Sequence, residues 1–526
     1  MAGKSNSTGR KLVSGSVLRV GNLIAAAIAS LFLMPFIVHH LGDRIYGFWT
    51  LAGAFIGYYG LIDLGLSSAV SQYICISVGR NDATECRAVF NTALRIQSLL
   101  GGVALVVTAA IAAATPWFSS NPVDAHLFWR VIVILGINAA LGFPSRVYGG
   151  VLEAEFRFDI QSWLAFVGLT LRTGLIVWAI LAGGGLLALA WMSLLASLPV
   201  TALQVWFARR EAPWARIGEL PRDMKRAKDF FSYSVYTFVA TIADVLRFQV
   251  DPIVISAFIG LAAVTHYKVA SIFSSYYCNL IIAAIFTCQP LLSRLHGAND
   301  RVGVDKVFFL ATKVSLCISV FICIALIGWG KPFVASWMGA GYEDAYLPLV
   351  VLSLAVLLDV CQSASVCLLY ATFNHRFYTY VNSAEGILNL AFSLALVRRF
   401  GILGVALGTL IGALLIRIVV QPWWVCKASG FTYSRYMGFL GKNLLYCGCL
   451  MGAATAIVSW GIRPSYPWLI GSAVCATAIY AVGCWLLVFN RREREQLLET
   501  LTNRRRKRTE MQGIEARQRS CNETAA

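Results

Sequence analysis

Charged residues interrupt the long apolar runs of this sequence at positions where a membrane-embedded helix rarely tolerates them. A charge at the centre of such a helix costs about 2.5 to 3.5 kcal/mol on insertion scales. We therefore expect most of these residues to pair or to face a water-filled interior, which indicates a hydrophilic cavity. For any single member, a structural ion pair or a place near a helix end is an equal explanation. The set comprises Asp63, Arg95, Arg146, Arg172, Asp244, Arg247, Asp251, Lys313, Asp359, Glu385 and Arg417.

The basic members of this set are candidates for holding an anion. Arg95 and Lys313 are repeat mates in a duplication described below, so we expect them at matching depth on opposite sides of the cavity. Two facing cations suit a bulky anion such as a phosphate or diphosphate. Aromatic rings can add stacking on sugars, although tyrosines near membrane interfaces are also common for structural reasons. The predicted substrate-binding residues are Arg95, Lys313, Arg247, Arg417, Arg172, Tyr59 and Tyr277.

The acidic members are candidates for binding a coupling ion. Asp244, Arg247 and Asp251 are spaced i, i+3, i+7, which places them on one stripe of a helix. The stripe is either a self-neutralised structural triad or a site whose carboxylates exchange a proton or a sodium ion. The predicted ion-coupling residues are Asp244, Asp251, Asp63, Asp359 and Glu385.

The composition requires a membrane protein. Of the 526 residues, 58% are hydrophobic and only 13% are charged, which lies outside the range of soluble proteins. Apolar runs of about 18 to 25 residues, each long enough to cross a bilayer, recur along the chain. We predict an all-α polytopic fold with about fourteen transmembrane helices, among them a first at 13–38, a second at 46–76 and a seventh at 230–259.

The sequence repeats itself in the same register after 218 residues, which predicts a duplication. Gly42 falls on Gly260, and Tyr58 and Tyr59 fall on Tyr276 and Tyr277. Because each copy holds an even number of helices, we expect two parallel six-helix repeats followed by two additional helices. The predicted divisions are a first lobe at 1–210, a basic linker at 211–228, a second lobe at 229–428, two helices at 429–490 and a basic tail at 491–526.

Lysine and arginine concentrate in the loops on one side of the predicted helices, which is therefore the cytoplasmic side. Both termini, the linker and the tail fall on that side. Topology also explains the net charge of +18, so we predict no nucleic-acid partner. The tail, with its run from Arg504 to Arg508, is either a solvated segment that anchors the last helix or a binding segment for anionic lipid or a neighbouring glycosyltransferase.

Signatures of enzymes, cofactors and metals are absent from the sequence. There is no phosphate-binding loop of the GxxxxGK[ST] type. Most of the fourteen cysteines lie in apolar runs, where cysteine behaves as a small hydrophobic residue, and no CxxC pair occurs. The spacing of Cys447 and Cys449 does not suit half of a zinc site. We therefore predict a protein without a cofactor or a metal, and not an enzyme.

The segment LMPFIVHHLGDRIYGFWTLAGAFIGYYGLIDLGLSSAVSQY resembles the start of bacterial polysaccharide-export flippases, the Wzx-like proteins of the multidrug/oligosaccharidyl-lipid/polysaccharide superfamily. The matching elements are Pro35, Leu41-Gly42, Tyr46-Gly47, Trp49, Asp63-Leu64-Gly65-Leu66 and Ala69. Gln72 departs from the family pattern, which often has a basic residue there. The resemblance implies a flippase of the bacterial inner membrane that moves undecaprenyl-diphosphate-linked oligosaccharides outward. Its implied partners are the lipid-linked oligosaccharide, membrane lipids, and a glycosyltransferase or polymerase of the same pathway.

Two other functions compete with this interpretation. A cation-coupled multidrug antiporter of the same superfamily would have a similar fold, but such proteins usually have twelve helices. A membrane glycan polymerase or ligase would act on the same lipid carrier, but such enzymes usually place catalytic residues in long extracytoplasmic loops. The longest loops predicted on that side, near 116–127 and 331–346, are short.

Overall fold

The computed structural model describes residues 2–80, 82–118, 122–218, 238, 241–247, 249–339, 341–372, 375–459, 466–491 and 493–495. Within these ranges the chain is helical throughout, without a strand. Thirteen helices are long and apolar enough to cross a membrane. Each corresponds to one of the fourteen predicted spans. The remaining prediction, at 230–259, lies partly outside the described residues, as does most of the predicted linker at 211–228.

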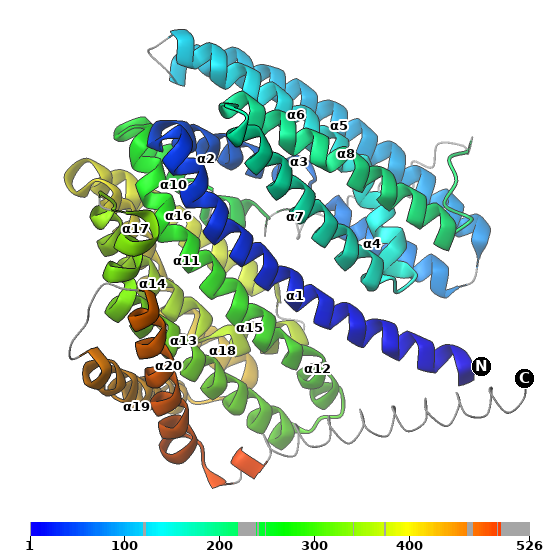
Figure 1. The fold of residues 1–526 in the computed structure, drawn as a ribbon. Coiled ribbons are helices and arrows are strands. Elements are labelled where there is room, and N and C mark those ends of the chain that lie inside the picture. Colours follow the sequence, from blue (N-terminus) through cyan, green and yellow to red (C-terminus); the bar gives the residue numbers. More distant parts are fainter. Residues whose placement is uncertain are drawn as a thin grey trace, which may run out of the picture.

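The described helices form two groups, with α1 between them in the view of Figure 1. We call the first group the first bundle: α1 (Ala2–Leu41), α2 (Asp43–Gly57), α3 (Tyr59–Ile62), α4 (Leu66–Gly79), α5 (Ala83–Phe118), α6 (Pro122–Ala154), α7 (Phe158–Leu181) and α8 (Leu186–Glu211).

The second bundle begins with the helical residues 241–247 and ends before the last two long helices. Its elements are α10 (Asp251–Phe258), α11 (Leu261–Ile285), η1 (Phe286–Cys288), α12 (Gln289–Gly297), α13 (Arg301–Met338), η2 (Glu343–Ala345), α14 (Tyr346–Val360), α15 (Ser363–Ala371), α16 (His375–Phe400), α17 (Ile402–Ala413), η3 (Leu414–Val420) and α18 (Gln421–Ser429). The two C-terminal helices are α19 (Tyr433–Ser459) and α20 (Tyr466–Gly483), which continues into η4 (Cys484–Val488).

The second predicted helix, 46–76, is broken into three pieces. Helix α2 ends at Gly57, the short α3 follows, and α4 starts after a turn at Asp63–Gly65. Leu64 and Gly65 in this turn have positive φ values of 51° and 72°. A helix cannot continue through such angles, and Gly65 adopts them without steric cost. The break therefore places the Asp63 carboxylate at the start of α4, where it accepts hydrogen bonds from the backbone and the hydroxyl of Ser67.

Helices α16 and α17 approach one another closely because α17 presents small residues to its neighbour. Gly404, Gly408 and Gly412 recur every four residues, and a Cβ added to any of them would crowd the backbone or a side chain of α16. Such spacing of small residues is a common device of membrane helix pairs. It brings the polar face of α16 against α17 and η3.

The two bundles meet at the end of the molecule that holds the loops around Gly42, Gly260 and Gly339. There Thr265 donates a hydrogen bond of 2.7 Å to the carbonyl oxygen of Asp43, and Tyr342 donates one to the Asp43 carboxylate. Trp337 donates one of 2.7 Å to the carbonyl of Leu31 on α1. A hydrophobic core that includes Phe48, Val264 and Leu349 joins the bundles at the same end. Of the other two large cores, one lies within the first bundle, and the other joins the second bundle to α19.

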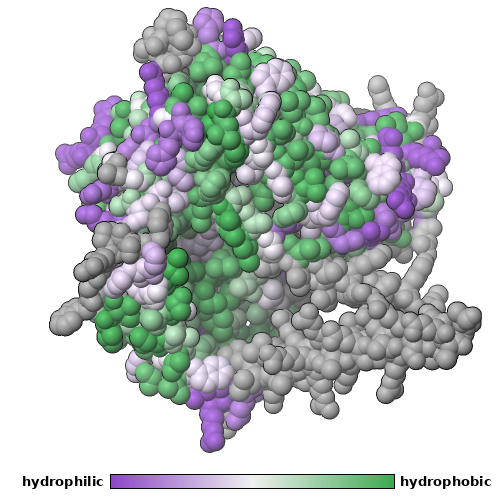
Figure 2. Space-filling model, in the orientation of Figure 1, coloured by the Kyte–Doolittle hydropathy of each residue, from purple (hydrophilic) through white to green (hydrophobic). Residues whose placement is uncertain are grey.

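The surface has the polarity of a membrane-embedded protein. Hydrophobic side chains cover the middle of the face seen in Figure 2, and hydrophilic ones gather at its opposite edges. Exposed apolar residues such as Phe32, Val106, Trp178 and Leu487 are 62 to 73% exposed, which is costly in water but suits contact with lipid tails.

We predict that Gly47→Ala weakens the contact between the bundles. A Cβ at Gly47 would overlap the carbonyl oxygen of Leu261, and overpacking of this kind costs about 1 to 3 kcal/mol. The purified variant should melt at a lower temperature than the unmodified protein in the same detergent. Gly53→Ala on the same helix is the matched control, because a Cβ there meets nothing within 4 Å. Equal melting temperatures for the two variants would contradict the prediction.

Candidate functional site

A cavity of about 820 Å³, which we call the central cavity, lies between the bundles. The first bundle contributes one face of α2, including Tyr46, Trp49 and Thr50. The second bundle contributes the rest of the wall, from residues 241–247, α10, α11, α14, α16 and α17. The charged residues in the lining are Asp244, Arg247, Asp251, Lys268 and Asp359. The lining thus carries three carboxylates and two cations, so the central cavity is less basic than the sequence led us to expect.

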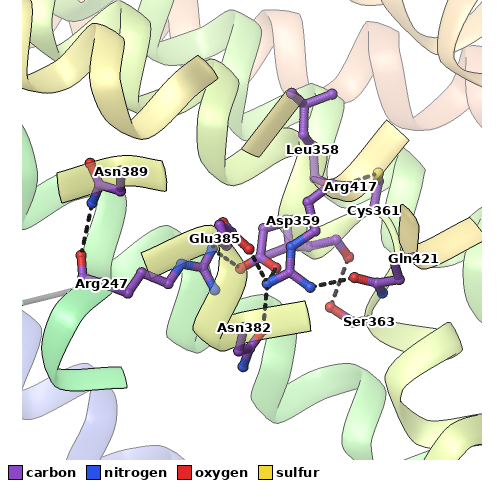
Figure 3. A network of polar contacts seen from close by, with 11 residues as sticks. Arg247, Leu358, Asp359, Cys361, Ser363, Asn382, Glu385, Asn389, Arg417 and Gln421 are labelled. Atoms are coloured by element: carbon purple, nitrogen blue, oxygen red, sulfur yellow. Dashed lines mark hydrogen bonds and ion pairs between the residues drawn. The ribbon is translucent and has the colours of Figure 1, made fainter. Parts of the chain in front are cut away.

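Four charged residues form a buried ring of ion pairs in the second bundle, which we call the ion quartet (Figure 3). Arg247 contacts Asp359 at 2.7 Å and Glu385 at 3.2 Å. Arg417 contacts the same two carboxylates at 3.1 and 2.6 Å. Because each carboxylate touches both guanidinium groups, two positive and two negative charges neutralise one another. The quartet connects residue 247 to α14, α16 and η3.

Arg417 is the most enclosed member, with no exposed surface. It lies on η3, the π-helical segment that directly follows α17. It donates hydrogen bonds to Gln421 and, at 2.8 Å, to the side-chain oxygen of Asn382. Gln362 donates a hydrogen bond to the Arg417 carbonyl oxygen, which compensates for the irregular backbone. Short π-helical segments occur frequently at functional sites.

The helical stripe predicted for Asp244, Arg247 and Asp251 does not continue through all three residues. Residues 249 and 250 form a turn and a bend, and α10 begins at Asp251. Arg247 finds its partners in Asp359 and Glu385 on other helices. Asp244 lies close enough to Arg247 for their opposite charges to attract each other. Asp251 belongs to a different group of side chains.

Asp251 is buried in a cluster of oxygen atoms, which we call the oxygen cluster. Tyr267 donates a hydrogen bond of 2.6 Å to one carboxylate oxygen of Asp251. The other carboxylate oxygen is buried without a hydrogen-bond partner in the described part of the chain, although Asn389 lies beside the group. The side-chain oxygen of Asn389 accepts hydrogen bonds of 3.1 Å from both Ser393 and Thr409.

These oxygens suit a small cation. Ser393 and Thr409 each also donate to the carbonyl oxygen of Val405 at 3.3 Å, so six residues contribute oxygen atoms to the cluster. A buried carboxylate oxygen without a partner is costly, and a hard cation or a proton would satisfy it.

In the first bundle, Asp63 pairs with Arg146 at 3.0 Å. Gln97, which is fully buried on α5, donates a hydrogen bond of 3.1 Å to the same carboxylate. Asp63 also caps α4 through Ser67. These bonds give Asp63 a structural role, because they hold the broken second helix against α5 and α6.

A second cavity, of about 420 Å³, lies inside the first bundle, and we call it the first-bundle cavity. Arg172 lines it from α7, and among the described residues no carboxylate pairs with this guanidinium. Ser193 lines it from α8 and is 5% exposed, with no hydrogen-bond partner for its hydroxyl in the described chain. Trp49 and Gly53 line both this cavity and the central one, so the two spaces adjoin at α2.

The structure places Arg95 and Lys313 elsewhere than the repeat led us to expect. Lys313 is buried on α13 and contacts the Glu493 carboxylate at 2.8 Å, and Arg95 is exposed on α5. Neither is among the residues that line the two cavities. Glu493 follows η4, so its contact with Lys313 depends on how the C-terminal helices dock, which the repeat could not reveal.

Tyr59 and Tyr277, by contrast, have matching environments. Both are 2% exposed. The Tyr59 hydroxyl hydrogen-bonds to Thr108 on α5, and that of Tyr277 donates to the carbonyl of Ser319 on α13. Each hydroxyl therefore links its own helix to the third membrane-spanning helix of the same half of the chain, which is α5 for Tyr59 and α13 for Tyr277. Their hydroxyls are engaged in packing, and neither residue is among those that line the cavities.

Sequence reasoning missed Lys268, Asn389 and Ser193. Lys268 lies two turns inside α11 and lines the central cavity. Its position inside an apolar run was a usable signal. The polar stripe of α16, with Asn382, Glu385, Asn389 and Ser393 at helical spacing, was another.

Three comparisons with known proteins bear on this arrangement. Residues 41–347 match the family described as "Polysaccharide biosynthesis protein". The chain is 21% identical to an uncharacterized membrane protein, EpsK, of Bacillus subtilis, across 90% of this chain and 95% of that protein. It is 22% identical to a putative O-antigen transporter of Shigella flexneri, across 76% of this chain and 96% of that protein. Its fold is similar to that of the lipid II flippase MurJ in an inward closed conformation, with a TM-score of 0.71 and 14% identity over 89% of this chain and 98% of MurJ.

We predict that Arg417→Met destabilises the protein strongly. The substitution leaves Asp359 and Glu385 with one guanidinium between them, and breaking a buried ion pair from one side costs about 3 to 5 kcal/mol. The melting temperature of the purified variant in detergent should fall well below that of the control Arg95→Met, which changes an exposed arginine. The double variant Arg417→Met with Glu385→Gln should recover part of the loss, because it removes the unpaired charge. Wild-type stability of Arg417→Met would show that the quartet is not required for folding.

Proposed function

The chain belongs to the family of polysaccharide biosynthesis proteins, and we propose that it is a flippase for undecaprenyl-diphosphate-linked oligosaccharides in the bacterial inner membrane. The observation that supports this most is the central cavity between two helix bundles that touch mainly at one end. A cavity of this size, flanked by a lipid-exposed surface, can admit a polar head group while a lipid tail stays in the bilayer. The family and the similarity to transporters favour transport over catalysis.

The direction of opening follows from the charge distribution. The loops around Gly42, Gly260 and Gly339 lie on the side with fewer lysines and arginines, which we assign to the extracytoplasmic face. Because the contacts between the bundles gather at that face, the conformation is closed to the outside. Both termini would then be cytoplasmic, and the head group would enter from the cytoplasmic side, where the lipid-linked oligosaccharide is made.

Arg172 and Lys268 are the cavity-lining cations without an ion partner among the described residues. Arg172 lies in the first-bundle cavity with Asn138, Ser193, Ser197 and Thr201, whose amide and hydroxyl groups can bind sugar hydroxyls. A guanidinium binds phosphate or carboxylate oxygens in a bidentate manner. We assign Arg172 to an anionic group of the head group, with Lys268 in the wall of the central cavity as a second contact.

The oxygen cluster around Asp251 would hold the coupling ion. When a sodium ion or a proton binds there, it satisfies the unpartnered carboxylate oxygen and neutralises one charge in the wall. Asp251 begins α10, directly after the break at residues 249 and 250, so occupancy can change how α10 meets α11 and α16. Ion binding in the second bundle would thus favour one arrangement of the bundles over the other.

A cation-coupled multidrug antiporter remains the second candidate function. Asp244 and Asp251 in the central cavity favour it, because they could bind an organic cation directly. The unpaired Arg172 in the adjoining space favours an anionic substrate. Partner enzymes of the pathway, such as a glycosyltransferase or a polymerase, would supply and consume the lipid-linked oligosaccharide.

We expect the purified protein in liposomes to flip a fluorescent polyprenyl-diphosphate-linked sugar, measured by the fraction of label that an impermeant quencher reaches. Arg172→Gln should lower the rate at least tenfold, since it removes the charge that binds the head group. Arg95→Gln is the matched control and should flip at the wild-type rate. If the wild-type protein does not flip this lipid but exports an organic cation dye, the antiporter is correct. If flipping occurs and Arg172→Gln has no effect, only the assignment of Arg172 is wrong.

We also expect Asp251→Asn to uncouple flipping from the ion gradient. In the same liposomes, imposed sodium and proton gradients are tested separately, and the effective gradient identifies the ion. The amide keeps the shape of the side chain but cannot offset a cation, so stimulation by the gradient should disappear. Asp305→Asn, which changes a carboxylate on α13 outside both cavity linings, should respond like the wild type. Undiminished stimulation in Asp251→Asn would exclude this carboxylate as the coupling site.

A further inference from the structure

Three cysteines meet where the C-terminal helices pack on the second bundle. Cys317 comes from α13, Cys447 from α19 and Cys484 from the start of η4. Their sulfur atoms all lie within 4.8 Å of one another, and those of Cys317 and Cys447 are 3.6 Å apart. We propose that these residues form a binding site for a soft monovalent metal ion, Cu(I). The proposal goes beyond the transport function and concerns residues that line neither cavity.

The spacing of the sulfur atoms fits metal coordination with small shifts. With metal–sulfur bonds of about 2.3 Å, three sulfurs in a trigonal plane lie about 4 Å apart. The separations in this cluster, 3.6 Å for one pair and at most 4.8 Å for the others, are compatible with that value. The cysteines come from three separate helices, so an ion bound between them would be held by backbone elements that are already in place.

The residues around the three cysteines determine which metal ion the site favours. The three cysteines are 7, 0 and 5% exposed, in a core that also contains Val320, Met451, Ala454 and Ala476. No histidine or carboxylate joins the group among the described residues. Zinc in structural sites takes four ligands, mostly cysteine and histidine, and among the described residues no fourth cysteine and no histidine joins the three, whereas sulfur ligands favour Cu(I).

A cation and an irregular helix lie next to the cluster. Lys313 is one turn before Cys317 on α13, and its ammonium group contacts the carbonyl oxygen of Val488 at 3.3 Å as well as the Glu493 carboxylate. Val488 ends the π-helical segment that Cys484 begins. The π-helical turn is thus fixed at both ends, by Cys484 and by the Lys313 contact.

Binding is a coordination step without redox change. Copper enters as Cu(I) and stays Cu(I), metal–sulfur bonds form, and each thiol that binds as a thiolate releases its proton to solvent. The bound ion would cross-link α19 and η4 to α13. Because the ion binds the folded state, it should also raise the melting temperature.

The test uses the full-length protein, purified under anaerobic conditions and titrated with Cu(I) buffered by a chelator. We expect one copper per chain to resist the chelator and the melting temperature to rise. Cys317→Ala, Cys447→Ala and Cys484→Ala should each lose this copper and the rise. Cys323→Ala is the matched control, since Cys323 is equally buried on α13 but belongs to another core. Retention of the copper in the three cluster variants would overturn the proposal.

A second measurement does not depend on variants that fold. X-ray absorption at the copper edge of the unmodified, copper-loaded protein should detect three sulfur neighbours at about 2.3 Å. Nitrogen or oxygen neighbours would place the copper at an adventitious site and overturn the proposal. Failure to retain any copper would overturn it as well. Zinc offered in place of copper should be removed by the chelator; tight zinc retention would contradict the assignment of a monovalent ion.

Discussion

The ion quartet is the interaction on which the second bundle depends. Two arginines and two carboxylates are buried in a part of the molecule that water reaches poorly, where each isolated charge would cost several kcal/mol. They are tolerated because every member touches two opposite charges, at distances from 2.6 to 3.2 Å. The ring fastens residue 247 to α14, α16 and η3, and it accounts for the irregular backbone at Arg417. Since Arg247 and Asp359 also line the central cavity, the same ring is both a structural tie and part of the cavity wall.

Among the residues that the structure describes, the two bundles differ in which charged side chains have no ion-pair partner. In the first bundle, Asp63 forms an ion pair with Arg146 and accepts hydrogen bonds from Gln97 and Ser67. The charged residue that lines the first-bundle cavity is Arg172. In the second bundle the quartet cancels itself, and the carboxylates of Asp244 and Asp251 remain in the wall beside Lys268. A substrate anion and a coupling cation would therefore bind on different sides of α2. Spatial separation of this kind allows both to be bound at once without forming a neutral pair.

Conformational change has identifiable places in this fold. The contacts between the bundles include hydrogen bonds to Asp43 and Leu31, a hydrophobic core and a close approach at Gly47 near one end, and a second close approach of Gly57 to Gln249. The helix breaks lie at Asp63–Gly65 in the first bundle and at residues 249–250 beside the central cavity. Such breaks can absorb a change of direction that a continuous helix would resist. The C-terminal helices pack on α13, away from these breaks, so they can move with the second bundle as one unit.

The sequence by itself determined the fold class and the positions of the helices. In lipid every backbone amide must be satisfied within its own helix, so the length and composition of the apolar runs suffice to predict the thirteen described spans. It also identified most of the charged residues that pair or line a cavity, since a buried charge is costly wherever it lies. It could not identify the partners. Arg247 was grouped with Asp244 and Asp251 on one helix but binds Asp359 and Glu385 from two others; Lys313 binds Glu493; and three cysteines far apart in the chain meet in one core. Periodicity describes neighbours along one helix, whereas these contacts are decided by how helices dock, and only the tertiary structure contains that information.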